Sequence, residues 1–225
     1  MVAGKMTLAY RGTKQHKLPK VSKATKAYVA NALRNLPETK AYDRFADYFY
    51  CFATATPPIV LCDIPQTTSP TSSSRIGDQI EPLSLDIRLT FYSNVATATQ
   101  TAWTNNVIRA VLIRWNIDTV PILNQVFQQT TNSALGITVN SPFVFEGHNQ
   151  KQFTVFYDKR VSIGPWGPGG TVLHIKKKLR SKISFDAGVT TGSGLYYLVL
   201  ISDDYTSSNV APRVSYYSRF LYSDA

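Results

Sequence analysis

The chain of 225 residues is poor in the side chains that cross-link small domains or hold metal ions. It has two cysteines, Cys51 and Cys62, and three histidines that are scattered along the sequence. Two cysteines cannot form a disulfide framework, and no His or Cys spacing matches a zinc site. We therefore expect two reduced thiols in or near strands, with a disulfide across a hairpin as the alternative. We expect no metal site and no cofactor.

Long apolar runs are also missing. No stretch approaches the roughly 20 apolar residues that a membrane-spanning helix requires. The first residues lack the apolar segment of a secretory signal. We expect neither a membrane span nor a secretory signal.

The motifs of common enzymes are absent from the sequence. No serine lies in a nucleophile-elbow sequence. The glycine-rich stretch 164–170 leads into Thr171 and a β-like run, whereas a P-loop continues through Gly-Lys-Ser/Thr into a helix. Asp203 and Asp204 are adjacent, and adjacent residues of a strand point to opposite faces, which does not suit a catalytic pair. We expect that the protein is not an enzyme.

What the chain does have is a segment whose charge is entirely positive. The first 36 residues hold eight of the 24 Lys and Arg residues and none of the 14 Asp and Glu residues, so the rest carries 16 cations against 14 anions. Such a segment buries too little apolar surface to fold alone and is suited to contact a polyanion. The expected nucleic-acid-binding residues are Lys5, Arg11, Lys14, Lys17, Lys20, Lys23, Lys26 and Arg34.

We assign residues 1–40 to a basic arm and residues 41–225 to a single folded domain. Ser22 is a candidate helix N-cap. Tyr28, Ala32 and Leu36 recur at helical spacing before a proline ends the pattern. The arm is therefore expected to be partly helical when it packs on a partner or on nucleic acid, because a helix this short is marginal in water.

From residue 42 onward the sequence consists of short β-like runs joined by loops. Leu83–Phe91 alternates apolar and polar residues, which is typical of a half-buried strand. Asp47–Ala53 is almost continuously apolar or aromatic and is expected to be a buried strand. The other expected strands are 107–115, 136–146, 151–161, 172–185, 195–202 and 214–222, and a short helical turn is expected within 118–127.

Eight strands without a long helix predict an all-β fold. The expected architecture is a single eight-stranded jelly roll, made of two four-stranded antiparallel sheets, with the basic arm at its N-terminus. An immunoglobulin-like sandwich is the alternative, but that fold usually takes only about 100 residues.

The expected strand 172–185 has two unlike faces. Its odd positions are mostly apolar and are expected to face the core, and its even positions are mostly cationic. The cations Lys176, Lys178, Arg180 and Lys182 are a secondary candidate for contact with phosphates. Two alternatives are a solvated strand that lysines protect from edge pairing and a contact with acidic loops of another subunit.

Several motifs, taken in their order, resemble capsid proteins of small circular, Rep-encoding single-stranded DNA (CRESS-DNA) viruses. The chain is also similar to the coat protein of satellite tobacco necrosis virus. The residues that carry the resemblance are 20–29, Arg75-x-Gly77-Asp78-x-Ile80, Arg109-x-x-Leu112-Ile113-Arg114-Trp115-Asn116 with Pro121-Ile122-Leu123, Phe156-Tyr157-Asp158-Lys159, and 218–225.

The resemblance implies a structural protein of the virion that assembles with copies of itself into an icosahedral shell. The smallest shells of that family have sixty subunits (T=1), and the arm lies inside. Sixty arms would bring about 480 positive charges to the phosphates of a packaged single-stranded genome. Assembly in the host nucleus is a further implication.

The arm departs from the arginine-dense arm of porcine-circovirus-type relatives, because lysine dominates it. This leaves the genome open between DNA, which the resemblance favours, and RNA, as in a satellite virus. A cellular β domain that binds single-stranded nucleic acid is a further alternative.

Overall fold

The computed structural model of the chain describes residues 22–23, 25–26, 38–51, 56–68, 71, 73–93, 106–129, 136–144, 152–164, 170–203 and 211–224. The chain divides into two units, Met1–Leu36 and Pro37–Ala225. The described part of the second unit contains one short helix, α2 (Leu123–Val126), and a set of strands. The strands are β1 (Thr39–Tyr50), β2 (Ile59–Val60), β3 (Gln79–Tyr92), β4 (Asn106–Trp115), β5 (Phe153–Ile163), β6 (Thr171–Lys178), β7 (Ile183–Phe185), β8 (Gly192–Ser193), β9 (Leu195–Ser202) and β10 (Arg213–Asp224).

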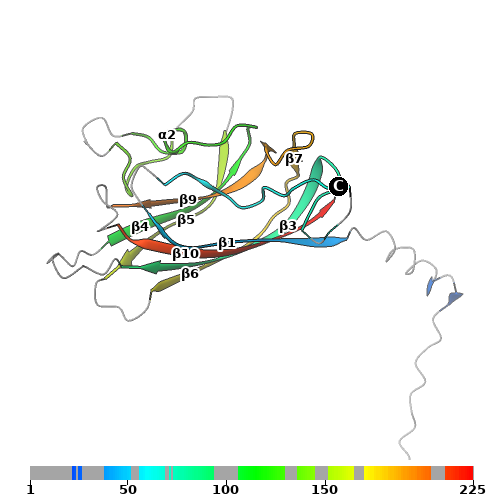
Figure 1. Cartoon of the computed structure of the whole chain (residues 1–225), viewed down its shortest axis with the longest axis horizontal. Coiled ribbons are helices and arrows are strands. Elements are labelled where there is room, and N and C mark those ends of the chain that lie inside the picture. The colour runs from blue at the N-terminus through cyan, green and yellow to red at the C-terminus, as the bar shows by residue number, and fades with distance from the viewer. Residues whose placement is uncertain are drawn as a thin grey trace, which may run out of the picture. The chain divides into compact units, whose positions relative to one another are not determined.

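The strands form two antiparallel sheets with the order of a jelly roll (Figure 1). The β3 sheet runs β1-β10-β3 and continues with β6, β7 and β8, and the β4 sheet runs β2-β9-β4-β5. Most connections cross from one sheet to the other, and the last strand lies between the first and the third. This is the double Greek-key winding of a jelly roll. The predicted fold class is confirmed, with β7 and β8 as short additions to one sheet.

Alternation along β3 determines which side of its sheet faces the core. Leu85, Ile87, Leu89 and Phe91 are fully buried, whereas the residues between them are exposed or half-buried. This pattern confirms the predicted half-buried strand. One residue departs from it, because Leu83 is exposed.

The two sheets differ in what covers their outer faces. The two central strands of the β4 sheet, β4 and β9, are buried on both sides, whereas the edge strand β5 is largely exposed. The outer side of the two central strands is covered by the segment that carries α2, in which the rings of Phe127 and Phe143 stack with their centroids 5.3 Å apart (Figure 1). The outer side of the β3 sheet is open to solvent, since Phe45 on β1 is 75% exposed.

The bounds and the burial of the first predicted strand, 47–53, differ from those of the observed strand β1. The strand begins at Thr39 and ends at Tyr50, and its side chains alternate between half-buried and exposed positions. Residues 47–53 were expected to be buried because they are apolar, but Tyr48 points to solvent on the open side of the sheet. β1 also takes in Lys40 from the predicted arm, whose Nζ donates to the Ser74 carbonyl and to Asp224 Oδ2.

The predicted strand 136–146 is also corrected. The described residues 136–144 form turns and one isolated bridge between Phe127 and Phe143. The Ser141 carbonyl accepts a hydrogen bond from Arg109, the Val139 carbonyl accepts from Arg109 and Arg160, and the Ser141 amide closes a turn by donating to the Thr138 carbonyl. The missing eighth principal strand is β2, whose two residues are too few for a sequence pattern.

Cys51 and Cys62 are free, buried thiols. Burial raises the pKa of Cys62 to about 12, and it raises the pKa of Cys51 as well. A thiol whose pKa is raised stays protonated at neutral pH and reacts poorly. Both cysteines therefore serve as small apolar residues of the core.

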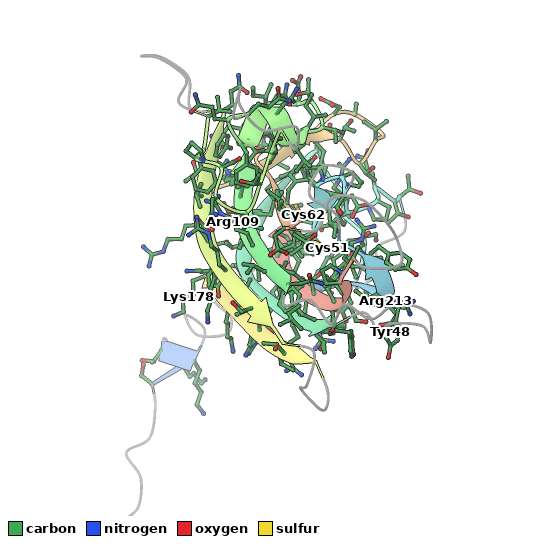
Figure 2. All side chains as sticks on the ribbon, turned by 90° about the vertical axis from the view of Figure 1, so that its left-hand side faces the viewer. Tyr48, Cys51, Cys62, Arg109, Lys178 and Arg213 are labelled. Carbon is green, nitrogen blue, oxygen red and sulfur yellow. The ribbon has the colours of Figure 1, made fainter. Side chains whose placement is uncertain are left out.

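Arg109 on β4 joins three parts of the fold from a buried position (Figure 2). Its Nε and Nη2 donate to the two carboxylate oxygens of Asp158 on β5, at 2.8 and 2.6 Å. Its Nη1 donates to the Ser141 carbonyl at 2.5 Å. The guanidinium also lies 5.0 Å from the ring centroid of Phe127 and 4.8 Å from that of Phe143.

We predict that Arg109→Lys lowers the free energy of unfolding by about 2–4 kcal/mol. A lysine cannot make the two-pronged carboxylate contact and reach the carbonyl at the same time, so buried acceptors lose their donors. Urea unfolding measures the change. Arg88→Lys on the open side of the β3 sheet is the matched control, with an expected change within about 0.5 kcal/mol. Equal effects of the two substitutions would contradict the structural role of Arg109.

Candidate nucleic-acid interface

The described part of the arm is a short helical piece. Ser22 Oγ accepts a hydrogen bond from the Thr25 amide at 3.1 Å, and the Lys26 amide donates to the Ser22 carbonyl at 3.0 Å. These bonds give Ser22 the geometry of the predicted N-cap. Lys23 and Lys26 are exposed. The other predicted arm residues lie outside the described residues: Lys5, Arg11, Lys14, Lys17, Lys20 and Arg34.

The four secondary candidates do not share one strand. The predicted strand 172–185 is broken into β6 and β7, both of which pair with β3. Pairing with β6 ends at Ser84 and pairing with β7 begins at Ile80, with Pro82 between them. Proline has no amide hydrogen to donate, so the ladder is interrupted there.

Lys176 and Lys178 therefore lie on β6, whereas Arg180 and Lys182 lie in the link to β7. All four are exposed. Five of the seven residues predicted to face inward are buried: Leu173, Ile175, Leu179, Ile183 and Phe185. Lys177 is half-buried and Ser181 is exposed, which corrects the prediction at these two positions. Lys182 Nζ lies 3.4 Å from Glu81 Oε1, so part of its charge is compensated locally. Lys176 and Lys178 form no ion pair within the described part of the chain.

Strand register places further cations beside the β6 lysines on the outer side of the β3 sheet, which we call the open face. One row across the sheet is Asp43–Arg219–Asp86–Lys176, and the next is Phe45–Tyr217–Arg88–His174. The open face consists of Ala41, Asp43, Phe45, Tyr48 and Tyr50 from β1, Arg213, Ser215, Tyr217, Arg219 and Leu221 from β10, Ser84, Asp86, Arg88, Thr90 and Tyr92 from β3, and Val172, His174, Lys176 and Lys178 from β6.

The two carboxylates of the open face are both engaged with cations or imidazole. Arg219 donates to both oxygens of Asp43, at 2.9 and 2.8 Å, and these bonds lower the pKa of that carboxyl. Asp86 Oδ1 lies 2.8 Å from His174 Nε2 and 3.9 Å from Arg88 Nε. Five Lys and Arg residues outnumber these two carboxylates and the exposed Asp47 of the β1 bulge, so the open face has an excess of positive charge. Such a face attracts polyanions.

Sequence reasoning missed Arg88, Arg213 and Arg219 as members of one surface. They come from β3 and β10, which are far apart in the sequence and become neighbours only through pairing. The signal that was available is the alternation of β3, which already placed Asp86 and Arg88 on the side opposite the core.

Three charged residues of the motifs that carried the sequence resemblance, Arg75, Arg109 and Asp158, lie at internal contacts of the fold. Arg75 is fully buried, and its guanidinium lies 4.2 Å from the ring centroid of Phe185. Its Nη2 donates to the Val189 carbonyl at 2.6 Å, and its Nη1 donates to the Gly77 carbonyl. Arg109 and Asp158 form the buried pair described above. These motif residues hold loops and strands together and do not face the open side.

Other kinds of site are not apparent in the described ranges. No group of three His, Cys, Asp or Glu side chains in them is arranged to hold a metal ion. Among the same residues there is no helix long and apolar enough to cross a membrane.

Comparison with known proteins gives distant structural likenesses only. No protein-family model matches the chain, and no curated protein matches it. The chain is similar to a subunit of the full particle of Israeli acute paralysis virus, with 8% identity over 99% of this chain and 81% of that chain and a TM-score of 0.30. It is also similar to the capsid of Penaeus monodon metallodensovirus, with 12% identity over 85% of this chain and 73% of that chain and a TM-score of 0.31.

A third likeness is to Broad Bean Stain Virus, with 10% identity over 92% of this chain and 90% of that chain and a TM-score of 0.28. All three are viral particles or capsids. Likenesses at this level carry no argument about function, and the jelly roll is read from the strand order of the chain itself.

We predict that the double variant Lys176→Gln, Lys178→Gln weakens binding to oligo(dT) and lowers the salt slope of the binding constant by about 1–2. Each lost phosphate contact on a single strand removes about 0.7 from that slope. Titration at several salt concentrations measures it. Lys159→Gln on β5 of the β4 sheet is the control, with no change expected. An unchanged slope in the double variant would remove these two lysines from the interface.

Proposed function

We propose that this protein is the structural subunit of a small icosahedral viral shell that packages single-stranded nucleic acid through its basic arm. The proposed shell is the T=1 assembly of sixty copies, and the proposed cargo is single-stranded DNA. In this role the protein is a non-enzymatic component of the virion.

Segregation of charge is the observation that carries the proposal. Eight of the 24 cations lie in the first 36 residues, where there is no acid, and the jelly-roll unit holds 16 cations against 14 acids. A folded domain with little net charge can pack against copies of itself without strong electrostatic repulsion. An attached arm whose charges are all positive can neutralise phosphates at the same time. A domain that bound nucleic acid alone would be expected to carry its basic charge on the folded surface.

The fold supports the same proposal. A jelly roll closes its core between two sheets and presents its loops at the ends, and viral capsid domains are among its known uses. Fold alone does not give function, because lectins share this architecture. The arm separates the two uses, since a sugar-binding domain has no need of a segment with eight cations and no acid.

The choice of DNA rests on the resemblance in motif order to CRESS-DNA virus capsid proteins. Phosphate contacts do not read sequence, and the arm is suited to phosphates of either nucleic acid. The alternative, a satellite-type coat protein that packages RNA, therefore differs only in the nucleic acid that is packaged. The arm would neutralise phosphates in the same way in both cases.

We predict that the purified full-length protein forms closed particles of uniform size in electron microscopy. A variant that lacks residues 1–19 is expected to form similar particles with less nucleic acid inside. It removes Lys5, Arg11, Lys14 and Lys17, so its binding to oligo(dT) should also depend less steeply on salt.

Two outcomes would count against the proposal. A protein that stays monomeric at high concentration and low salt is not a shell subunit. Packaging that survives unchanged in the shortened variant would show that the arm is not the main contact with the cargo.

A further inference from the structure

The open face carries exposed aromatic rings where β1 leaves its regular register. The pairing of β1 with β10 shifts between Ala46 and Phe49. Tyr48 lies in this bulge with a φ of 53°, which is a strained backbone conformation for a bulky residue. Bulges of this kind re-aim a side chain. Here the result is that Tyr48 is 58% exposed on the open face.

The ring of Tyr48 crosses β10 to reach a residue of β3. It stacks on Tyr92 with ring centroids 5.0 Å apart and an interplanar angle of 28°. The Tyr48 amide donates to Ser215 Oγ of the intervening strand at 3.1 Å. The bulge and the hydrogen bond hold an aromatic pair at the surface despite the strained backbone, in a place where the pair gains little from burial.

Two further aromatic residues of β1 and β10 lie on the open face, and the guanidinium of Arg219 lies 5.9 Å from the ring centroid of one of them, Tyr217. Phe45 on β1 is paired in register with Tyr217 on β10, and directly paired residues have Cβ atoms about 4.5–5.5 Å apart. Phe45 is 75% exposed, the largest exposure among the large apolar side chains of the described residues. We call Phe45, Tyr48, Tyr92 and Tyr217 the aromatic platform.

Arginines border the platform on the neighbouring strands. Arg88 of β3 is the partner of Tyr217 in the same row. Arg213 of β10 lies with its guanidinium 5.0 Å from the ring centroid of Tyr50 and donates to the Tyr50 hydroxyl at 3.0 Å. Figure 2 shows Tyr48 and Arg213 beside each other at one end of the molecule. Flat rings bordered by cations offer stacking surfaces and phosphate contacts side by side.

We propose that the aromatic platform binds the unpaired bases of single-stranded nucleic acid by stacking, while the cations of the open face contact its phosphates. This inference deepens the proposed function, because it adds a base contact on the shell domain to the phosphate contacts of the arm. Stacking accepts every base, so such a site fits a packaged strand of any sequence. The open face is therefore the surface of the domain that meets the cargo.

Charge favours nucleic acid over the open face of a second copy as the occupant. Asp43 and Asp86 are already engaged, and the excess charge is positive, so two open faces laid against each other repel. A polyanion is attracted by the same excess.

The test compares binding of the full-length protein to oligo(dT) and to an abasic strand of the same length, which keeps the phosphates and lacks the bases. Raised salt weakens the arm's phosphate contacts and leaves stacking as the larger share. The variant is Phe45→Ala combined with Tyr48→Gly. Glycine accepts the positive φ at position 48, so the fold is retained while both rings are lost.

The wild type is expected to bind oligo(dT) more tightly than the abasic strand, and the double variant is expected to lose about tenfold or more of that preference. Tyr48→Phe keeps the ring and should behave as the wild type. Val172→Ala, on the same face and outside the platform, should also leave the preference unchanged.

Three outcomes bear on the inference. A double variant that keeps the full preference for oligo(dT) would overturn it, even if shells and packaging are normal. A double variant that fails only in particle assembly would overturn it as well, because the face would then be a contact between copies. Loss of the preference in a protein that forms no shells would support the platform and would contradict the proposed capsid function.

Discussion

The period-two alternation of β3 is the constraint on which most of this structure depends. β3 pairs with β10 on one side and with β6 and β7 on the other, so its inward residues define the core side of the whole sheet. Burial of a large apolar side chain contributes about 1.5–3 kcal/mol. Leu85, Ile87, Leu89 and Phe91 together therefore contribute about 6–12 kcal/mol, which is comparable to the net stability of a domain. A slip by one residue would exchange the two faces and lose this contribution.

The same alternation creates the open face. Because Leu85 and Ile87 point inward, Asp86 and Arg88 must point outward, beside Arg219 and Lys176 of the paired strands. The β4 sheet follows another solution, in which Phe127 and Phe143 cover its outer side and Arg109 secures them. The centre of one sheet is thus covered by the segment that carries α2, whereas the outer side of the other sheet is exposed to solvent.

Much of the fold could be predicted from the sequence, and the reasons differ from element to element. Strands with clear alternation or dense apolar character, such as 83–91, 107–115 and 195–202, lie where they were expected. The prediction failed where a tertiary contact replaces a local one. Residues 136–144 have the composition of a strand, but a turn between Thr138 and Ser141 and contacts of Val139 and Ser141 with arginine side chains hold them as a loop.

The interface was less predictable than the fold. The β6 lysines were found because they alternate along one strand, whereas the aromatic platform combines residues from β1, β3 and β10. Tyr48 depends on a bulge and a positive φ that a run of apolar letters does not reveal. The run 47–53 was expected to be buried because it is rich in aromatic residues. Composition alone does not distinguish an aromatic side chain that is exposed, such as Tyr48, from one that is buried in the core.

The central claim is that this chain encloses a single-stranded genome, and the nucleic acid of purified particles tests it most directly. Particles are treated with nuclease to remove external strands, then opened, and the contents are digested separately with a single-strand-specific DNase and with RNase. The account predicts protected nucleic acid that is single-stranded and sensitive to the DNase. Particles with no protected nucleic acid, or contents that are double-stranded, would contradict it.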